Sequence, residues 1–110
     1  MRRLVIDGVT WLWKVEHAHV DGRCHEVFTA YLEGHKASPV RITFVERDGW
    51  HAGYPASGVI WSDGGAEINL NLPSSARRVI ELARRAGWSP ETARSATELD
   101  GVSRLLPDLS

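Results

Sequence analysis

The sequence predicts an α+β domain: an antiparallel β-sheet of about five to six strands, arranged as a meander of hairpins, followed by a C-terminal amphipathic helix packed on one face. Two observations predict this class. Apolar residues recur at every second position through much of residues 1–72, as in strands with one wet face. The apolar period then changes to 3.6, the period of a helix. At 110 residues, 43% of them hydrophobic, the chain 1–110 has the size and composition of a single domain.

The clearest element of the β-rich part is a hairpin around Asp21-Gly22. This dipeptide favours a two-residue type I′ turn, because both central residues of that turn need positive φ. Such a turn fixes the register of the flanking strands. It pairs Trp11 with Leu32, Trp13 with Ala30, Val15 with Phe28, His17 with Glu26 and His19 with Cys24. The first three pairs form one apolar face, which a slip by one residue would scatter.

Further strands are predicted over residues 40–46, 59–61 and 66–72, the last two as a second hairpin. In the strand over 66–72, Ile68, Leu70 and Leu72 alternate with polar residues, so we expect them to point inward. Residues 48–58 show no strand pattern and are expected to form a long loop.

A helix is predicted over about residues 74–87. Ser74 or Ser75 is of a type that caps a helix start, and Gly87 suits a left-handed C-terminal cap. Trp88 is expected to fold back onto this helix. The tail, residues 89–110, is predicted to be a short helix or an irregular segment, with a helix-start pattern at Ser89-Pro90.

The predicted register also gathers polar side chains beyond the apolar stripe, at the tip of the first hairpin. We call them the tip cluster: His17, His19, Cys24 and Glu26. Histidines at positions i and i+2 of a strand point to the same side, and cross-strand neighbours lie within a side chain's reach. These residue types suit zinc, and zinc with an open fourth position activates water. The simpler interpretation is a solvated hairpin tip.

Cys24 next to a histidine also has the minimum of an activated thiolate. No nucleophile elbow, glycine-rich phosphate loop or paired-carboxylate pattern accompanies it, so we expect a non-enzymatic protein.

Two surfaces are candidates for binding a partner protein. The predicted loop 48–58 carries Trp50, His51 and Tyr54. Aromatic residues of this kind are enriched at interface hot spots. The alternative is that Trp50 and Tyr54 fold back to cover one end of the sheet. The polar face of the predicted helix carries Arg77, Arg78, Arg84 and Arg85. An acidic protein or a nucleic-acid backbone would suit that face, but the net charge of −1 argues against nucleic acid.

Composition excludes several other classes. The single cysteine cannot form an internal disulfide. The apolar run after Arg2-Arg3 is too short for a signal peptide, and no run is long enough for a membrane span. We therefore expect a cytoplasmic protein without a membrane partner, either a monomer or a homodimer.

Two segments carry a resemblance. The opening IDGVTWLWKV (residues 6–15) resembles the start of many small bacterial proteins. The later segment, VI (79–80) followed by ARRAGWSP (83–90), resembles the ending of such proteins. The layout is similar to that of immunity proteins encoded beside polymorphic toxins. The resemblance implies a bacterial, non-enzymatic protein-binding module, an immunity-type inhibitor of a cognate toxin or another partner. The alternative function is a metal-binding enzyme or sensor that uses the tip cluster. The third candidate function is nucleic-acid binding through the arginine-rich helix.

Overall fold

The computed structural model describes residues 1–53 and 57–109, with the side chains of 108 and 109 left aside. The strands are β1 (Arg2–Ile6), β2 (Val9–Val20), β3 (Arg23–Leu32), β4 (Val40–Val45), β5 (Trp50–Ala52), β6 (Val59–Ser62), β7 (Glu67–Asn69) and β8 (Thr97–Asp100). The helices are α1 (Pro73–Arg85), α2 (Gly101–Arg104) and α3 (Leu106–Leu109). The α+β class is confirmed, but the strands form two sheets rather than the one predicted.

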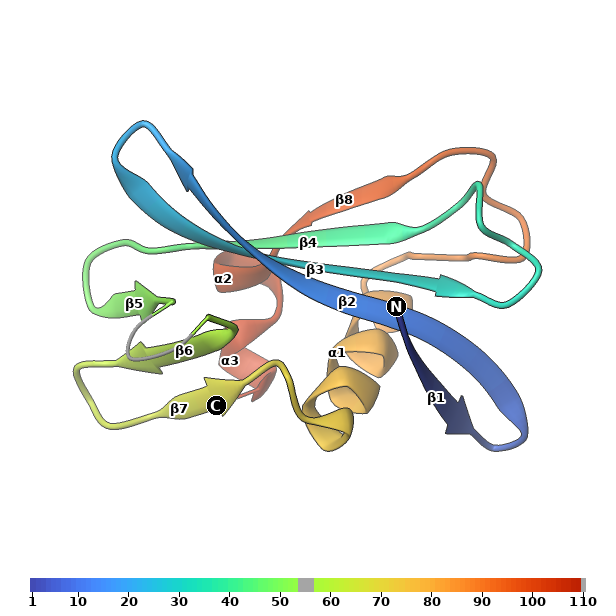
Figure 1. The fold of residues 1–110 in the computed structure, drawn as a ribbon, viewed down its shortest axis with the longest axis horizontal. Coiled ribbons are helices and arrows are strands. Elements are labelled where there is room, and N and C mark those ends of the chain that lie inside the picture. The colour runs from blue at the N-terminus through green and yellow to red at the C-terminus, as the bar shows by residue number, and fades with distance from the viewer. Residues whose placement is uncertain (54–56, 110) are drawn as a thin grey trace.

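The larger sheet has the strand order β1-β2-β3-β4-β8 (Figure 1). Strands β1 to β4 pair antiparallel with their neighbours in sequence, which confirms the meander. Strand β8 instead pairs parallel with β4, from Val40 opposite Thr97 to Thr43 opposite Asp100. The purely antiparallel prediction is therefore wrong at this edge. Parallel strands need a long crossover, and the second sheet and α1 supply it here.

The smaller sheet is antiparallel, with the order β5-β6-β7. Strand β5 lies inside the stretch predicted to be a loop, because a strand of only three residues is too short to show an alternating pattern. Leu72, predicted to point inward, is 48% exposed. The reason is that β7 ends at Asn69 and the chain turns before α1.

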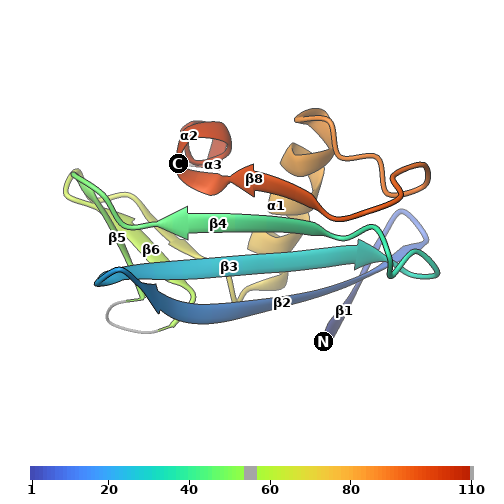
Figure 2. The ribbon, with the colours of Figure 1, turned by 90° about the horizontal axis from the view of Figure 1, so that it is seen from above.

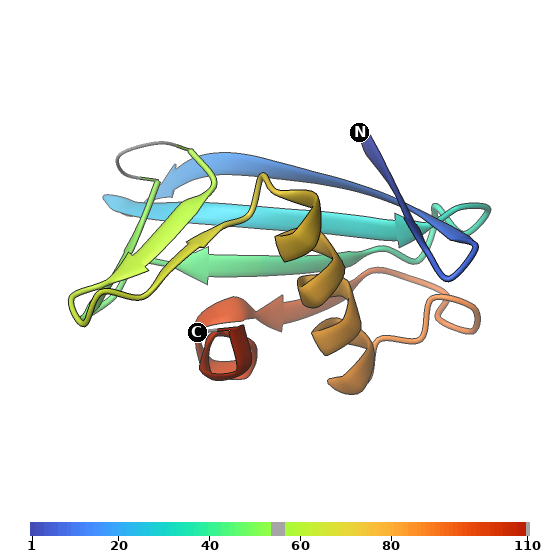
Figure 3. The same ribbon diagram turned by 90° about the horizontal axis from the view of Figure 1, so that it is seen from below.

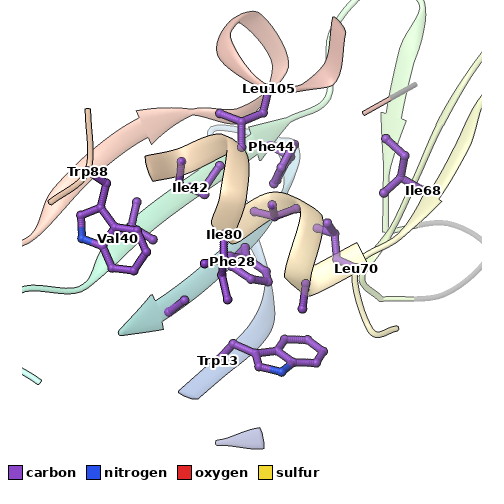
Figure 4. Close-up of a cluster of buried hydrophobic side chains, with 14 of the residues drawn as sticks. Trp13, Phe28, Val40, Ile42, Phe44, Ile68, Leu70, Ile80, Trp88 and Leu105 are labelled. Carbon is purple, nitrogen blue, oxygen red and sulfur yellow. The ribbon is translucent and has the colours of Figure 1, made fainter. Parts of the chain in front are cut away.

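The core lies between the larger sheet and the elements beneath it. Helix α1 and the smaller sheet lie side by side under one face of the larger sheet (Figures 1 and 3). The other face carries no helix or strand among the described residues, as the view onto that face shows (Figure 2). Figure 4 shows the packed side chains, which include Trp13, Phe28, Val40, Ile42, Phe44, Leu70, Ile80, Trp88 and Leu105. Burial of this apolar surface is the main driving force for the fold.

Helix α1 starts and ends slightly before its predicted bounds. Its N-cap is Leu72 without a side-chain cap, and Pro73 takes the first helical position, so the predicted serine cap is wrong. Proline suits that position because its missing N–H has no partner there in any helix. Gly87, with a φ of +113°, ends the helix as predicted. Trp88 folds back and is buried, and its indole N–H donates to the backbone oxygen of Ser38 at 3.2 Å.

The tail is more regular than predicted. Ser89-Pro90 begins a turn rather than a helix, and the chain then enters β8 and the short helices α2 and α3. Asp100 caps α2 by accepting from the backbone N–H groups of Val102 and Ser103. No helix in the described part of the chain is long and apolar enough to cross a membrane.

Candidate metal centre

The hairpin between β2 and β3 has the register that the sequence predicts. Asp21 and Gly22 have φ values of 53° and 77°, which a type I′ turn requires. His17 lies opposite Glu26, and His19 lies opposite Cys24. The predicted gathering of the tip cluster is therefore confirmed.

The side chains of the tip cluster form one continuous chain of contacts. The Sγ atom of Cys24 lies 3.6 Å from Nδ1 of His19. The Nε2 atoms of His19 and His17 are 2.9 Å apart. Nδ1 of His17 lies 2.6 Å from Oε1 of Glu26. A neutral imidazole donates through one nitrogen and accepts through the other. All three hydrogen bonds can therefore form together when the Cys24 thiol donates to His19, His19 donates to His17, and His17 donates to Glu26.

His17, His19 and Cys24 each offer a ligand atom, and these atoms all lie within 4.8 Å of one another. Zinc bonds of about 2.0–2.1 Å to nitrogen and about 2.3 Å to sulfur place tetrahedral ligand atoms about 3.3–3.6 Å apart. The observed contacts of 2.9 Å and 3.6 Å join different nitrogens of His19, so only one of them can be a spacing between two ligand atoms. Binding one ion therefore requires the His19 ring to rotate until a single nitrogen approaches both His17 and Cys24. His19 presents Nε2 to His17 and Nδ1 to Cys24, so the rotation of its ring selects the nitrogen that binds.

Glu26 supports the ligands from behind. The residue is fully buried, and its Oε1 accepts from Nδ1 of His17, which leaves the Nε2 lone pair of that ring free for a metal. Its Oε2 has no hydrogen-bond partner among the described residues. A buried carboxylate without full compensation is costly, and a cation bound through His17 would supply the missing positive charge. Glu26, predicted among the metal-binding residues, contacts His17 and is not one of the three residues whose ligand atoms converge.

Gly53, directly after β5, closes the inner side of the cluster. Its φ is +79°, and a Cβ there would come within 2.3 Å of Cε1 of His17 and 2.8 Å of Oε1 of Glu26. Only a glycine lets the backbone pass this close. Sequence reasoning missed this residue, because its role depends on the smaller sheet packing against the hairpin.

The environment of Cys24 bears on what its thiol can do. Partial burial raises the pKa of the Cys24 thiol, and the negative charges of Glu46 and Glu26 raise it further. A catalytic thiol needs the opposite shift, since the thiolate is the nucleophile. A bound cation favours the thiolate directly. The surroundings of Cys24 therefore suit a metal ligand better than a free nucleophile.

The residues predicted to form a binding loop lie in the smaller sheet. Trp50 is half-buried against the core. His51 stacks on Trp61 with ring centres 4.1 Å apart, and its Nε2 lies 2.8 Å from Oδ1 of Asp63. Tyr54 lies outside the described residues. The structure thus gives Trp50 and His51 contacts within the fold, and partner binding by this segment stays a prediction.

The arginines predicted to form one binding face divide into two groups. Arg77 and Arg84 form ion pairs with glutamates, at 2.9 Å and 3.1 Å. Arg78 and Arg85 line a groove that Arg104 of α2 also lines. Sequence reasoning missed Arg104, because only the tertiary fold brings α2 beside α1.

Comparison of the chain with protein-family models, with curated proteins and with solved structures found no match. The similarity to immunity proteins therefore stays a prediction from the sequence.

Proposed function

We propose that the protein binds a zinc ion through His17, His19 and Cys24, with Glu26 orienting His17. The observation that carries this proposal is the convergence of three ligand atoms within 4.8 Å, backed by a fully buried carboxylate. Nitrogen and thiolate sulfur are the ligand types that zinc prefers. A solvated hairpin tip would not require a buried glutamate behind one of its histidines.

Three protein ligands leave the fourth position of a tetrahedral ion open. Structural zinc sites are closed by four protein ligands, whereas three ligands plus water are typical of sites that react or exchange. The tip also lies at the surface, since His19 is exposed. The proposed function is therefore reversible zinc binding with one exchangeable position, which is the chemical basis of a metal-dependent enzyme or a metal sensor.

Metal analysis of protein purified without a histidine tag tests the proposal first. We expect one zinc ion per chain after reconstitution, bound tightly enough to compete with a chelating dye. Cobalt(II) in place of zinc is expected to give a thiolate-to-metal charge-transfer band. Cys24→Ser should remove that band, and His19→Ala should weaken binding at least about tenfold, because each leaves the ion with two protein ligands.

His25 provides the matched control. It lies on the same strand as Cys24, opposite Ala18, and faces away from the cluster. His25→Ala should keep the affinity and spectrum of the unsubstituted protein. Zinc well below one equivalent, or an equal loss in His19→Ala and His25→Ala, would show that the cluster does not hold the ion.

A further inference from the structure

A second candidate site lies away from the tip cluster, on the surface around α1. Two hollows there both border Arg78, one of about 520 Å³ and one of about 450 Å³. The first is lined by Arg78, Glu81, Leu82, Arg85, Ala86 and Arg104. The second is lined by Glu67, Ile68, Asn69, Leu72, Ser75 and Arg78. Since they share a lining residue, we treat them as one surface and call it the α1 groove.

The first hollow carries an excess of positive charge. Arg78 and Arg85 come from α1, and Arg104 comes from α2. The one carboxylate in its lining, that of Glu81, pairs with Arg77 at 2.9 Å. Arg85 forms no ion pair within residues 1–53 and 57–107. Guanidinium groups gathered in one concave place favour an anion there, and they bind carboxylates in a planar two-point fashion.

The second hollow adds an apolar contact. Leu72 is 48% exposed, and Ile68 also contributes to this lining. An exposed leucine next to a charged groove suits a partner that combines both chemistries.

We propose that the α1 groove binds an acidic segment of a partner protein. The carboxylates of that segment contact Arg85 and Arg104, and a neighbouring apolar side chain covers Leu72. A protein fits better than a nucleic acid for two reasons. The arginines line only the first hollow and its border at Arg78, whereas the second hollow adds the apolar Leu72, and the chain as a whole has a net charge of −1 rather than the positive charge typical of nucleic-acid binding.

The probe is a labelled peptide of alternating glutamate and aspartate that ends in two leucines. Fluorescence anisotropy measures its binding to the protein at low and at physiological salt. We expect saturable binding that weakens as salt rises. Arg85→Glu should weaken it at least about tenfold, because it replaces an attraction by a repulsion. Exchanging the two leucines of the peptide for serine should also weaken binding.

Arg94→Glu is the matched control, because Arg94 is exposed and lines neither hollow. This substitution changes the net charge of the protein by the same amount as Arg85→Glu. Binding that this variant weakens as much as Arg85→Glu does would overturn the proposal, because it would reflect overall charge. Tighter binding of a single-stranded oligonucleotide than of the peptide would overturn it in favour of nucleic acid. Arg85→Gln, with folding checked by circular dichroism, covers the case in which charge reversal damages the helix end. His19→Ala should leave peptide binding unchanged, so this test is independent of zinc.

Discussion

At the scale of single residues, the tip cluster depends on a buried carboxylate that never has to touch the ion. Glu26 fixes the ring of His17 through one oxygen, while its other oxygen lacks a partner among the described residues. Glu26→Gln keeps the shape and an acceptor for Nδ1 but removes the charge. We expect zinc affinity to fall about 10- to 100-fold, the usual effect of losing such a support. Competition with a chelating dye measures the change.

The matched control is Glu16→Gln. Glu16 lies on the opposite face of the same hairpin and pairs with Lys14 at the surface. That variant should bind zinc as the unsubstituted protein does. If Glu26→Gln behaved in the same way, the negative charge of Glu26 would have no role in zinc binding.

Zinc binding should also release a proton. The raised pKa of the Cys24 thiol means that this group is protonated at neutral pH before the ion arrives. The ion binds the thiolate, so the thiol proton leaves. We expect about one proton per zinc ion near pH 7, and a zinc affinity that rises with pH until the thiol pKa is passed. Calorimetry in buffers of different ionisation enthalpy counts the protons, and Cys24→Ser should reduce the count to near zero.

Gly53 offers a test of the backbone contact behind His17. Gly53→Ala places a methyl group where the structure leaves 2.3 Å to Cε1 of His17, so the imidazole must move. Gly49 is the control, because it has a similar φ of +83° but no atom within 4 Å of the added Cβ. Both variants should lose about 1 kcal/mol of stability from the left-handed backbone. Only Gly53→Ala should also lose zinc affinity, and equal affinities would mean that the cluster tolerates a displaced His17.

At the scale of elements, the sequence correctly predicted those features of the β2–β3 hairpin that depend only on neighbouring residues. The Asp21-Gly22 turn is two residues long, and this alone fixed the register that brings His17 opposite Glu26. Trp13 and Phe28, predicted to lie on the apolar face of the hairpin, are both buried. The tip cluster could be predicted for the same reason, since all its members lie on one hairpin.

Elements whose pairing is decided far along the chain could not be predicted. Strand β8 has only four residues and no alternating apolar pattern, and its pairing depends on β4, which precedes it by more than fifty residues. Strand β5 becomes a strand only because β6 lies beside it. Gly53 and Arg104 could not be predicted for the same reason, because their neighbours in space lie far from them along the chain.

Asp100 joins β8 to α2 and gives this junction a pH dependence. Partial burial alone would raise the pKa of the Asp100 carboxyl, but hydrogen bonds from the Ser103 N–H, the Arg47 side chain and the Val102 N–H, together with the Arg47 charge, lower it overall. A lowered folded-state pKa means that the ionised carboxyl stabilises the fold above its ordinary pKa of about 3.9 and loses this effect as pH falls through the folded-state value.

Asp100→Ala should therefore cost about 1 kcal/mol of unfolding free energy at pH 7, the usual value for a lost N-cap. The difference from the unsubstituted protein should shrink once the pH falls below about 4. Asp100→Asn keeps a capping oxygen without the charge, so it should retain most of the stability at neutral pH. Urea unfolding at several pH values measures all three proteins, and a pH-independent cost of Asp100→Ala would contradict the role of the charge.

At the scale of the whole molecule, the proposed zinc site lies at the edge of the apolar core rather than inside it. The apolar core between α1 and the larger sheet meets the tip cluster at its edge, where Cys24 packs against the core and the side chain of Glu26 is fully buried. The tip of the β2–β3 hairpin extends past α1 toward the smaller sheet (Figure 1). Domains that need zinc to fold lack such a core, and their metal supplies most of the folding free energy. This protein should therefore remain folded when zinc is removed.

Chelation should lower stability without unfolding the chain, because the ion adds only its binding free energy. At free zinc about a hundredfold above its dissociation constant, a single site contributes about 2.7 kcal/mol. For a domain of this length, that corresponds to a rise in Tm of roughly 10 °C. Calorimetry with and without chelator measures the shift, which should vanish in His17→Ala and persist in His25→Ala. Hydrogen exchange should place the effect at the amides of residues 15–28, while those of α1 change only through global stability. Complete unfolding in chelator would contradict a core that forms without zinc, whereas an unchanged Tm would contradict zinc binding itself.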